Sequence, residues 1–148
     1  GSSGTGPGQF NLVHSVKVDS DRRVYVADRR NGRIQIFDEN GKFLDMWDGM
    51  AQPSHMVVAQ DQTVWMSDPT LNRLVQFNLD GLFLTSWGAA GNFPGAFNNP
   101  HHFDVDQDGN LYVADYNNYR VQKFVPRPNA DRRRLIQPAF VSINGMEN

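Results

Sequence analysis

The stretch that decides the fold is VYVADRRNGRIQIF, residues 24–37. Two further copies follow it, VWMSDPTLNRLVQF at 64–77 and LYVADYNNYRVQKF at 111–124. When the chain is slid by 87 residues, the first and third copies match without a gap from residue 1 to residue 37, and a slide of 40 residues places the middle copy. Self-similarity at a period of about 20–50 residues is the signature of a repeat architecture.

Hydrophobic and polar residues alternate within each copy, which predicts β-strands rather than helices. In the first unit the alternation predicts strands over 14–18, 24–27, 33–37 and 43–47, and Asn40-Gly41 is a strong hairpin signal. Four short antiparallel strands in each unit are typical of a β-propeller blade. We therefore predict an all-β fold, a β-propeller of four-stranded antiparallel blades.

The predicted organisation is one partial propeller of about three blades. Its parts are an inter-blade loop over 1–12, blade 1 over 13–52, blade 2 with a Gly/Pro-rich loop over 53–99, and blade 3 with a basic C-terminal tail over 100–148. Because the repeat extends back through Gly1 and Gly4, we expect the chain to be cut from within a larger protein. Closed propellers have about four to eight blades. We therefore expect open blade faces and self-association of the incomplete propeller.

The composition excludes several classes of function. The 148 residues include no cysteine, which removes disulfides, thiolate zinc sites and cysteine nucleophiles. The formal net charge is −2, so no global basic field indicates a nucleic-acid-binding protein. No apolar run approaches the ~18 residues that a membrane helix needs.

Each copy carries an aspartate followed five residues later by an arginine. The three pairs are Asp28 with Arg33, Asp68 with Arg73, and Asp115 with Arg120. The aspartate should end the second strand of its unit and the arginine should open the third. A carboxylate–guanidinium pair would then tie the turn together. We assign these residues a structural role rather than a role in ligand binding.

The three copies resemble the NHL-repeat family of β-propellers. A narrower resemblance rests on GPGQF at 6–10, on His14, on ADRRNGRIQ at 27–35 and on Pro100-His101, which look like the propeller of peptidyl-α-hydroxyglycine α-amidating lyase. That resemblance implies a six-bladed ring, so that three blades would be half of it. It also implies zinc held by three channel histidines, release of glyoxylate from a peptide, and a secreted or periplasmic compartment.

His14 and His101 fall where two zinc ligands of that lyase lie, and they share one slot two blades apart. They are the metal candidates. In the middle blade this slot holds Ser54, with His55 one residue on, and His102 stands where the lyase has an aspartate. We take Ser54, His55 and His102 as candidate ligand-binding residues and assign no catalytic residue. The alternative is that all four histidines are rim residues satisfied by backbone or water.

Three functions follow from these observations. The first is a module that binds a peptide, a small molecule or a protein through its channel mouth and loops. The alternative is a zinc-dependent amidating-lyase-like enzyme in the full-length protein, with the isolated chain inactive. A second alternative, RNA binding, rests on Arg127 and Arg132–Arg134, for which a solvated tail is favoured.

Two further expectations concern calcium and the tail. The loops at 19–21 and 106–110 are aspartate-rich but lack the bidentate glutamate of a calcium loop, so calcium is not expected. Leu135-Ile136 is the candidate for the outer strand of the third blade.

Overall fold

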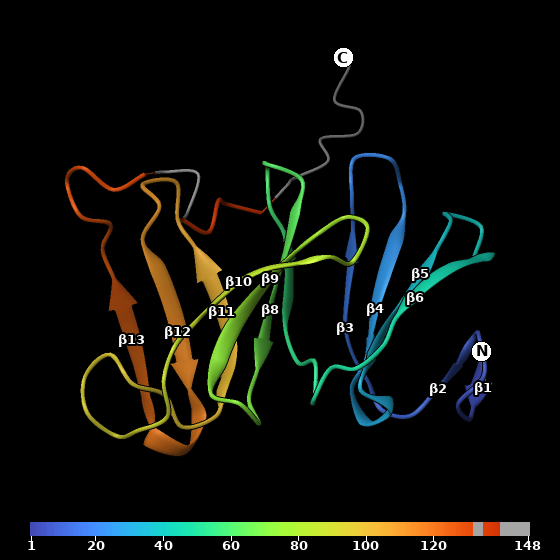
Figure 1. Cartoon of the computed structure of the whole chain (residues 1–148), viewed down its shortest axis with the longest axis horizontal. Coiled ribbons are helices and arrows are strands. Elements are labelled where there is room, and N and C mark those ends of the chain that lie inside the picture. The colour runs from blue at the N-terminus through green and yellow to red at the C-terminus, as the bar shows by residue number, and fades with distance from the viewer. Residues whose placement is uncertain (132–134, 140–148) are drawn as a thin grey trace, which may run out of the picture.

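The computed structural model describes residues 1–131 and 135–139. Figure 1 shows three twisted antiparallel sheets standing side by side, and each sheet forms one blade. Blade 1 contains β3 (Val13–Val18), β4 (Val24–Asp28), β5 (Arg33–Phe37) and β6 (Phe43–Trp47). Blade 2 contains β7 (Met56–Val58), β8 (Thr63–Asp68), β9 (Arg73–Asn78) and β10 (Phe83–Trp87). Blade 3 contains β11 (Pro100–Val105), β12 (Leu111–Asp115) and β13 (Arg120–Phe124).

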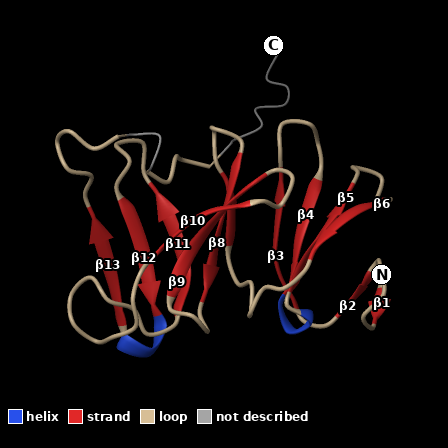
Figure 2. Cartoon of the chain, in the orientation of Figure 1, coloured by secondary structure: helices blue, strands red, loops and turns tan. Residues whose placement is uncertain are grey.

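The remaining elements are small. Strands β1 (Ser2–Ser3) and β2 (Gln9–Phe10) pair in parallel within the first loop. The short helices η1 (Arg29–Asn31) and η2 (Tyr116–Asn118) lie at the same end of blades 1 and 3 (Figure 2). Within the two described ranges, no helix has the length and hydropathy of a membrane-spanning segment. The predicted all-β fold of antiparallel blades is confirmed.

Two clusters of buried apolar side chains join the blades. The first contains Tyr25 and Trp47 of blade 1 together with Met56 and Phe77 of blade 2. The ring of Trp47 lies 6.0 Å from that of Phe77, so the contact crosses from one blade to the next. The second cluster joins blade 2 to blade 3 and includes Trp65. Full burial of a large apolar side chain such as Phe or Met contributes about 1.5–3 kcal/mol to the free energy of unfolding.

The C-terminal segment differs from the prediction. Among the described residues, blade 3 has three strands, and Leu135-Ile136 does not form a fourth. Ile136 is buried in the second apolar cluster instead. The backbone N–H of Gln60 donates to the carbonyl of Pro138, which holds this segment beside blade 2. Burial of an apolar side chain between blades therefore outweighs edge pairing here.

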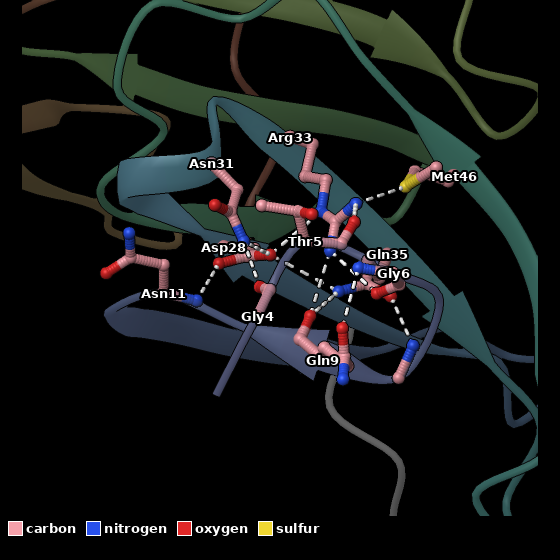
Figure 3. A network of polar contacts seen from close by, with 11 residues as sticks. Gly4, Thr5, Gly6, Gln9, Asn11, Asp28, Asn31, Arg33, Gln35 and Met46 are labelled. Atoms are coloured by element: carbon pink, nitrogen blue, oxygen red, sulfur yellow. Dashed lines mark hydrogen bonds and ion pairs between the residues drawn. The ribbon is translucent and has the colours of Figure 1, made fainter. Parts of the chain in front are cut away.

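A buried arginine organises the loop that precedes blade 1. Arg33, at the start of β5, donates its Nε–H to Asp28 at 2.8 Å, and the two side chains are only 5% and 0% exposed. Its other nitrogens donate to the carbonyls of Thr5, Gly6 and Gln9 (Figure 3). All three acceptors belong to the 1–12 loop, so the guanidinium fixes the path of that loop.

Two amides complete the arrangement in blade 1. Asn31 donates to the carbonyl of Gly4 at 2.9 Å, and Gln35 donates to that of Gln9 at 2.7 Å. We call Asp28, Asn31, Arg33 and Gln35 the loop clamp of blade 1 (Figure 3). The clamp supplies the loop with the hydrogen bonds that an irregular segment cannot make within itself.

Blade 3 repeats the loop clamp at every position, 87 residues further on. Arg120 pairs with Asp115 at 3.0 Å and donates to the carbonyls of Asn92, Phe93 and Ala96. The amides Asn118 and Gln122 hold the same loop. The loop is the wide yellow one, residues 88–99, that lies below β12 and β13 in Figure 1.

Blade 2 has no such clamp. Leu71 and Val75 stand where the two amides of blade 1 stand, and the preceding connection is shorter by seven residues. Among the described residues no ion pair joins Asp68 to Arg73, and the Nε of Arg73 is buried without a hydrogen-bond partner. The predicted ion pair is therefore present in blades 1 and 3 and wrong for blade 2. The physical reason is the missing loop, whose carbonyls hold the arginine in the other two blades.

The clamp predicts unequal effects of equivalent substitutions. Arg33→Ala leaves the buried Asp28 carboxylate and the loop carbonyls unpaired, and should lower the free energy of unfolding by about 3–5 kcal/mol. Arg73→Ala, the matched control, should cost about 1 kcal/mol or less, since no ion pair is lost. Urea unfolding of the two variants measures the difference. Equal losses of stability would contradict this account of the clamp.

Candidate functional site

Four histidines from all three blades come together at one end of the inner strands. His14 lies in β3, His55 directly precedes β7, and His101 and His102 lie in β11. The ring centres of His14 and His101 are 5.0 Å apart, and those of His55 and His102 are 4.7 Å apart. We call these four residues the histidine cluster. The structure thus brings together both metal candidates and both histidines predicted to bind a ligand.

Local backbone irregularities position two of the rings. The register of β3 against β4 shifts between Val13 and Ser15, and that of β11 against β12 shifts between Pro100 and His102. The two shifts bracket His14 and His101. A β-bulge re-aims the side chain that it carries. Equivalent bulges therefore turn equivalent histidines toward each other.

The tautomer of His14 follows from its hydrogen bond. Its Nδ1 lies 3.1 Å from the backbone carbonyl of Ser54, and a carbonyl only accepts. Nδ1 therefore carries a hydrogen, and in the neutral form of the ring Nε2 carries the lone pair. The buried Ser54 also places its hydroxyl 3.3 Å from the same nitrogen. Ser54 thus orients His14, while the neighbouring His55 contacts blade 3.

His101 and His102 share a proton-dependent contact. Their Nδ1 atoms are 2.8 Å apart, so one must donate and the other must accept. Burial lowers the pKa of both, and His14 adds to both shifts. The cationic Arg29 acts further on His101, and Lys17 acts further on His102. The pair is therefore uncharged at neutral pH.

His55 is the most strongly perturbed member of the cluster. Burial lowers its pKa to about 4, with His102 and Lys17 adding to the shift and Asp104 opposing it. Its ring also makes an edge contact with Phe103 at 5.2 Å. His55 is consequently a neutral imidazole near pH 7.

An open groove of about 400 Å³ adjoins the cluster. We call it the histidine groove, and its polar lining is His55, His102, Lys17, Asp104 and Tyr112. Lys17, Asp104 and Tyr112 were not predicted. Asp104 lies two residues from His102 on one strand, so strand alternation could have placed both on one face. For Lys17, which comes from another blade, the sequence carries no comparable signal.

The metal candidates fit only part of a zinc site. Two imidazoles on one tetrahedral zinc ion, with zinc–nitrogen bonds of about 2.1 Å, have ring centres about 5 Å apart. His14 and His101 match that spacing, and the free Nε2 lone pair of His14 suits a ligand. In the part of the chain that the structure describes, however, no group of three or more His, Asp or Glu side chains could hold a metal. The described residues thus supply two ligand positions and not a complete set.

Comparison with solved structures agrees with the fold. Streptogramin B lyase superposes with a TM-score of 0.61 at 17% identity, covering 78% of this chain and 40% of that one. Virginiamycin B lyase from Staphylococcus aureus gives 0.58 at 14% identity, over 84% of this chain and 42% of the other. At this identity the likeness shows the fold, that of a β-propeller.

Sequence comparison gives the family. Residues 10–37 and 97–124 match the NHL repeat. Human NHL repeat-containing protein 3 is 34% identical over 141 residues, and Xenopus laevis peptidyl-glycine alpha-amidating monooxygenase B is 30% identical over 151. The matches cover 85% and 93% of this chain but 39% and 17% of those proteins. The chain belongs to the NHL-repeat β-propellers, and it spans less than half the length of these relatives.

The two ranges that match the NHL repeat correspond to particular parts of the structure. They hold the blades that have a loop clamp, and the corresponding part of blade 2 lies outside them. In that part of blade 2, Leu71 and Val75 replace the clamp amides.

The lowered pKa of His55 predicts a pH dependence of stability. An unfolded histidine has a pKa near 6.5, so between about pH 6.5 and pH 4 the unfolded chain binds the proton that folded His55 excludes. Stability should therefore be greatest above pH 6.5 and fall as the pH drops through that window. At about 1.36 kcal/mol per pKa unit, the loss due to His55 is at most about 3 kcal/mol, because solvent at the partly exposed ring screens the effect.

Urea unfolding at several pH values measures this dependence. A His55→Gln variant should show a flatter profile of stability against pH below pH 6.5. Glutamine does not titrate, so the unfolded variant binds no extra proton at this position. Parallel profiles for wild type and variant would contradict the burial of a neutral His55.

Proposed function

We propose that the protein is a ligand-binding propeller module whose binding surface is the histidine cluster with the histidine groove. The observation that carries this proposal is the convergence of four imidazoles from three blades beside one open groove. The imidazoles and the open groove between blades provide what a binding site needs, namely directed polar groups on a concave surface.

The charges around the cluster favour an anionic ligand. Lys17 and Arg29 act on the histidines, and Asp104 is the single acid in the lining of the groove. Neutral imidazoles can donate an N–H to a carboxylate, and Lys17 can pair with it directly. The occupant that fits best is the carboxylate end of a peptide. The name of one relative, peptidyl-glycine alpha-amidating monooxygenase, supports a glycine-terminated peptide as the probe.

A second candidate function, a zinc-dependent amidating-lyase-like activity, rests on the spacing of His14 and His101. Zinc held there would supply Lewis-acid chemistry. This chain would contribute the two imidazoles, with Ser54 fixing the tautomer of His14. A third ligand would have to come from outside the described residues. The RNA-binding alternative rests on Arg127 and Arg132–Arg134. The last three lie outside the described residues, and no observation on the described ones favours this function.

A peptide titration tests the first function. A tetrapeptide ending in glycine carboxylate should shift the NMR signals of His55 and His102, and its C-terminal amide should bind at least about tenfold more weakly. Lys17→Gln should weaken carboxylate binding to a similar extent. Arg22→Gln, which alters an exposed pair with Glu39, is the control and should change nothing. Equal binding of carboxylate and amide would overturn the assignment of an anion site.

Zinc separates the two functions in the same experiment. The binding module takes up the carboxylate peptide in the presence of a chelator. The lyase alternative instead requires that the full-length protein take up zinc, that both His14→Ala and His101→Ala abolish this uptake, and that the protein release glyoxylate from a peptide ending in α-hydroxyglycine.

A further inference from the structure

Blades 1 and 3 fill the space beside their clamp arginine with their own preceding loop. In each case the loop brings a phenylalanine onto the blade. Phe10 lies 5.9 Å from Phe37, and Phe97 lies 5.9 Å from Phe124. The occupant of this space is thus a glycine-containing loop that offers backbone carbonyls to the arginine and a phenyl ring to the blade.

The equivalent space in blade 2 is open. A groove of about 470 Å³ lies between residues 48–51 and strands β8, β9 and β10. Its apolar lining includes Met50, Leu71, Phe77 and Phe83. Phe77 is the equivalent of Phe37, and its ring contacts are with side chains of the blades, Trp47 and Phe83. We call this space the blade 2 groove.

The polar groups of the blade 2 groove are incompletely satisfied. The buried Nε of Arg73 has no partner among the described residues. Asp68 accepts the backbone N–H of Leu71 at 3.2 Å rather than a guanidinium bond, and burial raises its pKa. An N–H buried without an acceptor is costly, so a ligand that supplies one gains binding energy.

We propose that the blade 2 groove is a docking site for a glycine-containing loop of a partner protein. Arg73 donates to backbone carbonyls of that loop, and a phenyl ring of the loop packs on Phe77 and Phe83. The partner thus supplies in trans what the chain itself supplies to blades 1 and 3.

Charge selects this occupant over a small anion. Asp48 and Asp68 both line the groove and outnumber Arg73. A carboxylate or phosphate would meet a local excess of negative charge, whereas a neutral peptide carbonyl accepts a hydrogen bond without it. The groove also lacks the donors of Asn31 and Gln35, since Leu71 and Val75 replace them. Fewer bonds make the docking reversible, unlike the permanent loops of blades 1 and 3.

A synthetic peptide with the sequence of residues 88–99, GAAGNFPGAFNN, is the probe. Added to the whole chain, it should shift the backbone NMR signals of residues 48–51 and of Leu71. Arg73→Gln should weaken binding by at least about tenfold, because the guanidinium bonds are lost. Replacing the second phenylalanine of the peptide by alanine should weaken it as well.

A variant that is expected to bind the peptide more tightly separates binding from folding, because misfolding would weaken binding rather than strengthen it. Leu71 is exposed, and Leu71→Asn restores the donor that Asn31 and Asn118 use toward a loop glycine carbonyl at 2.9 Å in both clamped blades. It should tighten peptide binding by about fivefold. Arg22→Gln should leave the affinity unchanged.

Two results would overturn the proposal. One is absence of peptide binding to wild type, and the other is equal affinity of wild type, Arg73→Gln and Leu71→Asn. Lys17→Gln, which tests the histidine cluster, should bind the peptide like wild type. Failure of the anion site and failure of the blade 2 groove are therefore distinguishable.

Discussion

The buried guanidinium of Arg33 is the interaction on which the rest of the arrangement depends. A guanidinium removed from water needs acceptors for its N–H groups. One carboxylate cannot supply them all, so the preceding loop must wind close enough to present its carbonyls. The same Asp28 carboxylate accepts the N–H of Asn11, and helix η1 binds the carbonyls of Asn11 and Leu12. The clamp therefore delivers the chain to β3 on a fixed path, immediately before the bulge that turns His14 inward.

This constraint links the two unusual features of the molecule. In blade 3 the corresponding bonds, from Asn98 to Asp115 and from η2 to residues 98–99, precede the bulge at His101. The two blades with a clamp thus carry matching histidines at matching register shifts, while the blade without a clamp carries Ser54 and His55 at this place. In the same blade the Nε of Arg73 is buried without a hydrogen-bond partner and lies beside an open groove. The open blade 2 groove therefore accompanies the absence of a clamping loop, and the two loops that are present lead into the strands that carry His14 and His101.

The repeat allowed much of this to be predicted. Alternation placed the strands of blade 1 to within a residue, and a shared slot paired His14 with His101. The missing ion pair of blade 2 was not predicted, because the spacing of its Asp and Arg is the same as in blades 1 and 3. The preceding connection, shorter by seven residues, is one difference that the spacing does not reveal. The replacement of clamp amides by Leu71 and Val75 was visible in the sequence, but its meaning required the carbonyls that those amides bind. The contact between His101 and His102 depends on a bulge, which periodicity does not reveal.

The tautomer of His14 tests the central claim most directly, namely that the loop clamp positions the histidine. Imidazole ¹H–¹⁵N NMR distinguishes Nδ1–H from Nε2–H in wild type, Arg33→Lys and Arg73→Lys. Lysine keeps the charge but cannot make the divergent bonds of the guanidinium. We predict the Nδ1–H form in wild type and Arg73→Lys, and a mixture of both tautomers in Arg33→Lys. An unchanged Nδ1–H form of His14 in a folded Arg33→Lys variant would contradict the account.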